Sequence, residues 1–182
     1  MGRHINQEDG NLTMNIRSVT EADAERWWAL RLRALRDNPE AFASSYEQSR
    51  DTPVEEVRER IRKYDAENFA LVAEVDNSFA GMVGLYRESH TKLQHRGRVW
   101  GMYVAPEYRG TGVGRALMHD LIIRAKQVEG LRQLELEVAE VAASAQGLYR
   151  SLGFERYGTV PQAIHVDGRY LDVEWMVLFL QS

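Results

Sequence analysis

The first part of the chain combines a short alternating segment with two stretches of helical periodicity. Residues 14–18 alternate apolar and polar side chains, which predicts a strand. Thr20, followed three residues later by Asp23, is a helix start of the capping-box kind, and the helix should end at Asn38, which precedes a proline. Thr52-Pro53 predicts the start of a second helix, because proline is tolerated in a first turn. The first helix carries Ala24, Trp27, Trp28, Arg31, Ala34 and Leu35 at helical spacing.

From residue 69 onward the pattern changes to the apolar runs of strands. Residues 69–75 and 79–86 flank the turn-forming residues Asp-Asn-Ser and predict a β-hairpin. Residues 98–104 and 131–138 predict two more strands, with a helix over about residues 112–128 between them. A β-α-β connection of this length makes the two strands parallel, with a right-handed crossover.

The last part of the chain predicts a short helix and a second hairpin. The helix covers residues 144–151 and should stop near Gly153. Strands over residues 163–166 and 170–180 flank Asp167-Gly168, which is typical of a type I′ turn. The order of elements predicts an α+β fold, or mixed α/β. About four helices would flank a central, mostly antiparallel mixed sheet with one parallel β-α-β crossover.

The domain organisation follows from the length and from the polar beginning of the chain. A chain of 182 residues is expected to form one domain, and no linker interrupts residues 14–182. Residues 1–13 are polar and lack the apolar centre of a signal peptide. We therefore expect a flexible N-terminal tail over residues 1–13, with Met14 a candidate for the native first residue.

Composition excludes several classes of function. The chain has no cysteine, which excludes disulfides, thiolate metal ligands and a cysteine nucleophile. Its net charge of −4 argues against a dedicated nucleic-acid binder. No apolar run approaches the ~20 residues of a membrane span. The five histidines lack the spacing of metal ligands. We therefore expect a cytoplasmic protein with no metal and no nucleic-acid or membrane partner.

A glycine-rich loop carries the candidate chemistry. It consists of Arg109, Gly110, Thr111, Gly112, Val113, Gly114 and Arg115. The loop follows a predicted strand and enters a predicted helix. Glycines permit left-handed backbone angles and the close approach of a ligand. Successive N–H groups and the helix N-terminus together favour an anion, and two arginines bracket the loop. The pattern predicts a pyrophosphate site.

Other interpretations of this loop compete with that one. A structural turn would need neither three glycines nor two arginines. A dinucleotide site would require a glycine or alanine at the sixth place of the fingerprint, where Arg115 stands. A Walker A loop is excluded, because no Gly-Lys-Ser/Thr follows.

Two motifs resemble the GCN5-related N-acetyltransferase (GNAT) superfamily. The first is Arg-x-x-Gly-x-Gly over residues 109–114, which is similar to the acetyl-CoA pyrophosphate loop of that family and follows a strand ending in Val-x-Pro. The second, over residues 145–154, matches the family pattern Ala-x-x-Leu-Tyr-x-x-x-Gly-Phe. The resemblance covers about residues 14–180 and is strongest over residues 98–158.

The resemblance implies an acetyl-CoA-dependent N-acetyltransferase in which a primary amine attacks the thioester directly through a tetrahedral intermediate. The loop from Arg109 to Arg115 would hold the pyrophosphate. The strand end at Met102, Tyr103 and Val104 would offer backbone groups to the pantetheine and to the acetyl carbonyl. A positioned amide that binds a developing oxyanion contributes about 2.7–4 kcal/mol.

The resemblance also assigns two candidate catalytic residues. Tyr149 occupies the place of the tyrosine that stabilises or protonates the departing thiolate. Glu137 corresponds to a glutamate that some members use as a general base, here through water, while Glu135 on the same strand face is expected to be a solvated strand glutamate without a catalytic role. One position departs from the family pattern: Ala142 stands where many members have an asparagine that helps to hold the pantetheine.

The acceptor site is the least specified part of the sequence. By resemblance, residues 42–47, with Phe42 and Tyr46 as candidate contacts, and the region around residues 161–163 would line the acceptor cleft. The acceptor would be a small-molecule amine, or the N-terminus or a lysine of a peptide, and a homodimer stays open. The alternative function is a non-catalytic acyl-CoA sensor or interaction module on the same fold, which binding without turnover would reveal.

Overall fold

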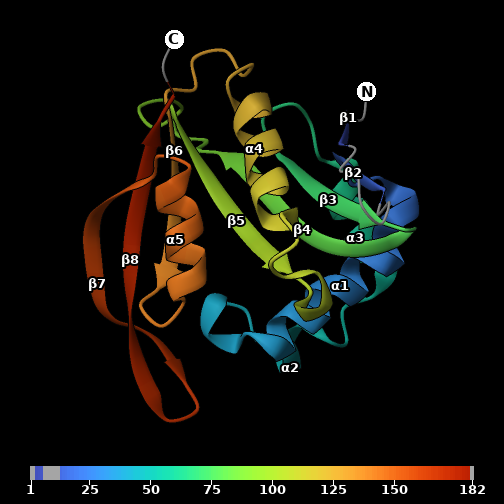
Figure 1. Ribbon diagram of the computed structural model, residues 1–182, viewed down its shortest axis with the longest axis horizontal. Coiled ribbons are helices and arrows are strands. Elements are labelled where there is room, and N and C mark those ends of the chain that lie inside the picture. Colours follow the sequence, from blue (N-terminus) through green and yellow to red (C-terminus); the bar gives the residue numbers. More distant parts are fainter. Residues whose placement is uncertain (1–2, 6–12, 181–182) are drawn as a thin grey trace.

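The computed structural model describes residues 3–5 and 13–180, which form an eight-stranded sheet with helices on both faces (Figure 1). The strands are β1 (Arg3–Ile5), β2 (Met14–Ser18), β3 (Phe69–Val75), β4 (Ser78–Arg87), β5 (Arg96–Val104), β6 (Gln133–Ala139), β7 (Glu155–Val166) and β8 (Arg169–Phe179). The helices are α1 (Ala24–Asp37), α2 (Tyr46–Ser49), α3 (Val54–Arg62), α4 (Val113–Ala125) and α5 (Ala143–Ser151).

The sheet has the order β1-β2-β3-β4-β5-β6-β8-β7, and within the described residues β5–β6 is its one parallel pair. The predicted fold class is therefore confirmed, including the crossover from β5 through α4 to β6. The segment over residues 1–13 contains a short strand, β1, which pairs antiparallel with β2. Residues 1–2 and 6–12 of that segment lie outside the described residues. No helix in the described part of the chain is long and apolar enough to cross a membrane.

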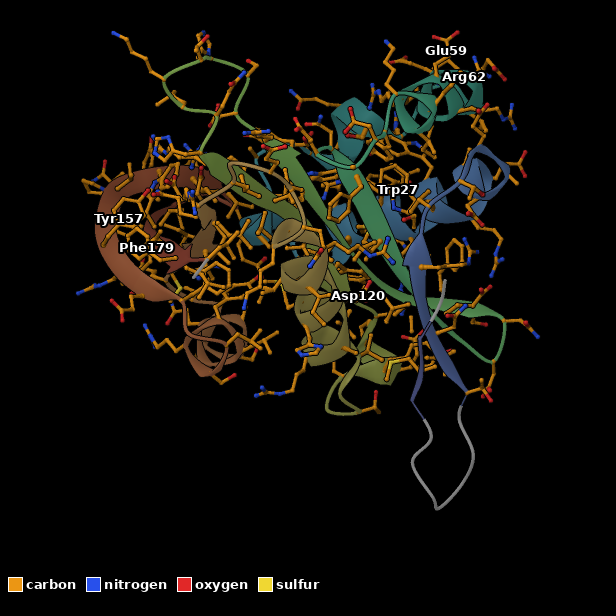
Figure 2. The ribbon with its side chains drawn as sticks, turned by 90° about the horizontal axis from the view of Figure 1, so that it is seen from above. Trp27, Glu59, Arg62, Asp120, Tyr157 and Phe179 are labelled. Carbon is orange, nitrogen blue, oxygen red and sulfur yellow. The ribbon has the colours of Figure 1, made fainter. Side chains whose placement is uncertain are left out.

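Two apolar clusters hold the helices against the sheet. On one face α4 and α5 pack on the strands, and Leu117 and Leu121 of α4 share a cluster with Leu71 and Leu85. On the other face α1 and α3 pack around Trp27. Figure 2 shows these layers, with Asp120 of α4 on one side of the sheet and Glu59 and Arg62 of α3 on the other. Because both faces of β3 and β4 are covered, these strands are continuous apolar runs.

Strand β7 differs from its prediction. The sequence predicts a strand over residues 163–166, whereas β7 starts at Glu155 and pairs with β8 at the edge of the sheet. Most of its side chains are exposed, so the apolar alternation that identifies a half-buried strand is missing. A register shift between Val160 and Ile164 accommodates Pro161, which lacks a ladder donor. Tyr157 lies at this edge in Figure 2.

Strands β5 and β6 pair over only part of their length. The parallel register joins Arg96–Arg98 to Gln133–Glu135. Beyond Arg98, within the described residues, β5 pairs with β4 while β6 pairs with β8. The rest of β5, up to Val104, therefore presents backbone groups on its β6 side without a strand partner. The chain then enters the loop before α4 at this same end of β5.

Candidate active site

The glycine loop forms a concave set of backbone donors at the start of α4. Gly112 is the N-cap and has φ +90°, and the first hydrogen bond of the helix runs from the Ala116 N–H to the Gly112 carbonyl oxygen at 3.0 Å. The N–H groups over residues 113–115 therefore precede the first helical bond. Gly110 also has a positive φ, +79°, and a Cβ at either glycine would meet no atom within 4 Å. The space before these donors is open, as an anion site requires.

Gly114 serves a different purpose, because it lets α4 approach its neighbours closely. A Cβ at Gly114 would lie 3.2 Å from Cε of Met102 and 3.4 Å from Cδ2 of Leu148. These contacts come from β5 and α5, respectively. The third glycine thus brings the start of α4 against both elements that carry candidate site residues.

The two arginines brace the loop. Arg109 donates from Nε to the Val104 carbonyl oxygen at 3.0 Å and from Nη2 to Oδ1 of Asn38 at 2.8 Å. Arg115 donates from Nη2 to the Ser151 hydroxyl at 2.8 Å. These bonds tie the loop to β5, to the end of α1 and to α5. The hydroxyl of Thr111 also turns inward and donates to the Tyr108 carbonyl oxygen at 2.6 Å. These three side chains therefore bond to the protein itself, and the backbone N–H groups remain to contact a ligand on the open side of the loop.

Strand β5 carries a bulge next to the loop. Gly101 has φ +67°, and β5 has one more residue than β4 between the pairs Gly84–Trp100 and Met82–Tyr103. The side chain of Tyr103 points to the α1 face, where its hydroxyl donates to Oδ2 of Asp37 at 2.8 Å. Burial, followed by this bond to a carboxylate, raises the pKa of Tyr103. Because the Tyr103 side chain points away, this residue would contact a ligand through its backbone groups.

Tyr149 lies in the core cluster between α5 and the sheet. The residue is 5% exposed, and its ring centroid is 6.0 Å from that of Phe154. Burial raises the pKa of the phenol above its usual value, because a phenolate would lose its hydration. Tyr149 therefore stays protonated at neutral pH, as a proton donor must.

The two glutamates of β6 differ in their surroundings. Glu135 is 1% exposed and accepts two bonds from Arg96, each at 2.6 Å, and one from Gln133 at 2.7 Å. Burial opposes its ionisation, but these donors and the charge of Arg98 outweigh burial and hold the pKa of Glu135 below its usual range. Glu137 is exposed, at the position paired with Trp175 of β8. The prediction of a solvated glutamate is therefore wrong for Glu135, whose carboxylate is buried and bound by these donors, whereas the Glu137 side chain is exposed.

Tyr149 and Glu137 lie on different faces of the sheet. Leu136 and Val138, the neighbours of Glu137 in β6, belong to the cluster that contains Tyr149. Since side chains alternate along a strand, Glu137 points to the opposite face. Burial raises the pKa of Tyr86 on β4, and the charges of Glu88, Glu137 and Glu135 act in the same direction, against the charge of Arg98.

A cavity of about 460 Å³ lies between the segment after α1 and the β7–β8 hairpin. The predicted residues Phe42 and Tyr46 both line it, together with the hairpin residues 163–167. The structure therefore brings together two segments that are more than a hundred residues apart. Within the described residues no cluster of histidine and carboxylate side chains could hold a metal ion.

Sequence reasoning did not single out Arg31, which is not itself one of the lining residues but contacts the lining residue Phe42. Its guanidinium carbon lies 4.4 Å from the centroid of the Phe42 ring. One signal was available: Arg31 lies four residues from Trp27 and from Leu35, so it interrupts the apolar stripe of α1.

The comparisons with known proteins agree on one family. The model of the acetyltransferase (GNAT) family matches residues 25–154. Spermidine N(1)-acetyltransferase of Vibrio cholerae is 27% identical over 128 residues, which cover 70% of this chain and 73% of that protein. L-methionine sulfoximine/L-methionine sulfone acetyltransferase of Pseudomonas aeruginosa is 39% identical over 79 residues, which cover 43% of this chain and 45% of that protein.

Solved structures show the same fold. A GCN5-related N-acetyltransferase from Kribbella flavida has a TM-score of 0.78 and 27% identity, covering 92% of this chain and 98% of that one. The Salmonella typhimurium protein YncA, solved with its cofactor acetyl-CoA, has a TM-score of 0.81 and 24% identity, covering 92% and 94%. With the family model spanning most of the chain, the protein belongs to the acetyltransferase (GNAT) family and is an acetyl-CoA-dependent N-acetyltransferase.

Proposed function

We propose that the protein transfers an acetyl group to a primary amine by direct attack of the amine on the thioester, through a tetrahedral intermediate. The observation that carries the proposal is the open set of backbone donors at the start of α4, next to the unpaired side of β5. Acetyl-CoA supplies the activated acetyl group when it is bound. The residues of this chain bind it, orient the amine and move protons.

The loop fits a diphosphate by its shape and its electrostatics. Gly110 and Gly112 have positive φ angles and open space at their Cβ positions, so no side chain crowds the loop there, and the partial positive charge of the α4 N-terminus favours an anion. Arg109 and Arg115 keep the loop in this form through their bonds to Val104 and Ser151. The backbone of residues 102–104 would then bind the amides of the pantetheine and the acetyl carbonyl. Ala142 has only a methyl side chain, so it would add no hydrogen bond to the pantetheine.

Tyr149 is the proposed proton donor. Its raised pKa keeps the hydroxyl protonated, so it can stabilise or protonate a thiolate, whose conjugate thiol ordinarily has a pKa of about 8.5. Glu137 is the proposed base. Its exposed carboxylate can take the proton of the amine through water. Phe42 and Tyr46 are the proposed acceptor contacts in the 460 Å³ cavity.

The test of the loop is the affinity for acetyl-CoA of the variant Gly112→Asp. An aspartate would bring a negative charge to the diphosphate and would occupy the open space, so we expect the affinity measured by calorimetry to fall about 100-fold or more. Gly168→Asp is the matched control, because Gly168 also has a positive φ, +72°, and no atom within 4 Å of its Cβ position. Undiminished affinity of Gly112→Asp would refute the loop assignment.

The sensor alternative is tested by turnover. Purified protein is mixed with acetyl-CoA and a panel of amines, and free coenzyme A is measured with a thiol reagent, which the cysteine-free chain does not consume. Acetylation of any amine supports the enzyme. Tight binding of acetyl-CoA with no turnover on the panel would favour the sensor. The cytoplasmic location and the homodimer stay predictions.

A further inference from the structure

Arg31 is a largely buried cation that has no counter-charge among the residues the structure describes. Its Nη1 atom is buried and has no hydrogen-bond partner among the residues the structure describes. The guanidinium stacks on the ring of Phe42, and Nη1 lies 3.8 Å from the position that a Cβ of Gly101 would take. Burial lowers the pKa of Arg31 to about 10, and Tyr64 acts in the opposite direction. The group therefore stays charged at neutral pH.

A comparison with Arg98 shows that the lack of a counter-charge at Arg31 is unusual. Nη1 of Arg98 is also buried without a hydrogen bond, but the carboxylates of Glu88 and Glu135 lie 3.0 and 3.3 Å from that guanidinium. Buried charges in proteins are normally paired in this way, because an unpaired donor costs the free energy of its lost hydration. In the described part of the chain no carboxylate acts on the Arg31 guanidinium in this way.

The position of Arg31 connects the cavity to the proposed reaction site. Phe42, on which it stacks, lines the 460 Å³ cavity. On its other side is the bulge at Gly101, one residue before the backbone segment 102–104 that would present the acetyl group. An amine that passes Phe42 on its way from the cavity to residues 102–104 would therefore bring its other atoms within reach of the guanidinium.

We infer that Arg31 binds a carboxylate of the acceptor, so that the substrate is a small carboxylated amine of the size of an amino acid. This inference rests on the proposed function of the site. A guanidinium offers a planar pair of N–H donors that matches a carboxylate, and a bound carboxylate neutralises the buried charge. A cavity of about 460 Å³ accommodates one small molecule.

The first test compares matched acceptors with the wild-type protein. The panel contains α-amino acids, their carboxamides and the corresponding decarboxylated amines, each assayed for acetylation. We expect kcat/KM for the preferred amino acid to exceed that of its carboxamide at least about 30-fold, the ratio for one buried charge pair. Equal values, or a preference for amines without a carboxylate, would overturn the inference while leaving the acetyltransferase function intact.

The second test uses Arg31→Met, which keeps an unbranched side chain and removes the charge. We expect KM for the amino acid to rise about 30-fold or more, and KM for the carboxamide, which has no charge to pair with the guanidinium, to rise far less. The melting temperature should not fall, because the variant loses a buried unpaired charge. A purely structural Arg31 predicts the opposite: a lower melting temperature and equal losses on both substrates. Arg58→Met, at a half-buried arginine of α3 paired with Glu55, is the control for loss of one charge.

Direct binding separates this inference from the proposed function. The amino acid is titrated by calorimetry into wild-type protein and Arg31→Met, each saturated with coenzyme A. Binding to the wild type but not to the variant supports the inference even if no amine is acetylated, in which case only the proposed function fails. Equal binding to both proteins, or to neither, contradicts it.

Discussion

The two ends of β5 differ in how completely their polar groups are satisfied. At the first end, Arg96–Arg98 pair with β4 and β6, and the carboxylate of Glu135 accepts bonds from Arg96 and Gln133. At the other end, β5 lacks a partner on its β6 side within the described residues, the first turn of α4 presents free N–H groups, and Arg31 has no counter-charge. One strand thus joins a closed region to an open one.

The difference predicts that mutations at the two ends of β5 affect different properties of the protein. At the closed end each charge has a partner, so changes there should affect folding. At the open end the N–H groups of the α4 N-terminus and the Arg31 guanidinium are available to a ligand, whose binding would stabilise the fold. Removing one of these polar groups should affect binding and turnover while leaving stability equal or higher, whereas a change in the packing around them can still lower stability.

The largest expected effect on the closed end is that of Glu135→Gln. The variant leaves Arg96 and Arg98 without their shared carboxylate, and we expect the free energy of unfolding, measured with urea, to fall by about 3 kcal/mol. Glu137→Gln is the matched control on the same face of β6, where an exposed change costs within about 0.5 kcal/mol. Equal losses of unfolding free energy in the two variants would contradict the claim that the paired end of β5 carries the stability.

The pH dependence of this effect follows from the lowered pKa of Glu135. A carboxylate whose folded pKa lies below its unfolded value, about 4.3, stabilises the fold above that pH and loses the contribution as the pH falls through the folded pKa. The difference in unfolding free energy between wild type and Glu135→Gln should therefore be largest near neutral pH and should shrink below about pH 4.3. A constant difference across that range would rule out the charge as its cause.

On the open side, Tyr149→Phe should lower kcat about 100-fold with little change in the affinity for acetyl-CoA. The ring and its contact with Phe154 remain, and only the proton donor is lost. Because burial raises the pKa of Tyr149, the wild-type rate should not fall through ionisation of this phenol near pH 8. Tyr170→Phe, at an exposed tyrosine, serves as the control. An unchanged kcat in Tyr149→Phe would remove the residue from the mechanism.

The smallest effects concern two helical glycines. Gly114→Ala would push a methyl group against Met102 and Leu148 and should cost about 1 kcal/mol of unfolding free energy. Gly147→Ala in α5 meets no atom within 4 Å and should instead stabilise the fold by about 1 kcal/mol. Thermal unfolding checks both signs, and a gain for Gly114→Ala would mean that α4 does not need this close approach.

Much of the fold could be predicted because its signals are local. The strands over residues 69–75 and 79–86 are buried on both faces, and the loop around Gly112 needs left-handed backbone angles that its glycines indicate. The edge strand β7 could not be predicted over its full length, because exposed side chains carry no alternation. The place of Phe42 and Tyr46 in a cavity came from the family resemblance, since no local pattern joins them to residues 163–167.

The arginines show what sequence alone leaves open. Arg109 and Arg115 are candidate phosphate ligands by position, but their bonds to Val104 and Ser151 depend on the packing of α4 against β5 and α5. Arg31 interrupts an apolar stripe, yet its isolation depends on Phe42 and on the bulge at Gly101, which lies seventy residues away in the chain.

The structure of the protein crystallised with acetyl-CoA tests the central claim most directly. We predict diphosphate oxygens at about 2.7–3.2 Å from backbone nitrogens of the Gly112–Arg115 segment, with the pantetheine along the unpaired side of β5. A coenzyme bound elsewhere, with this loop empty, would contradict the account.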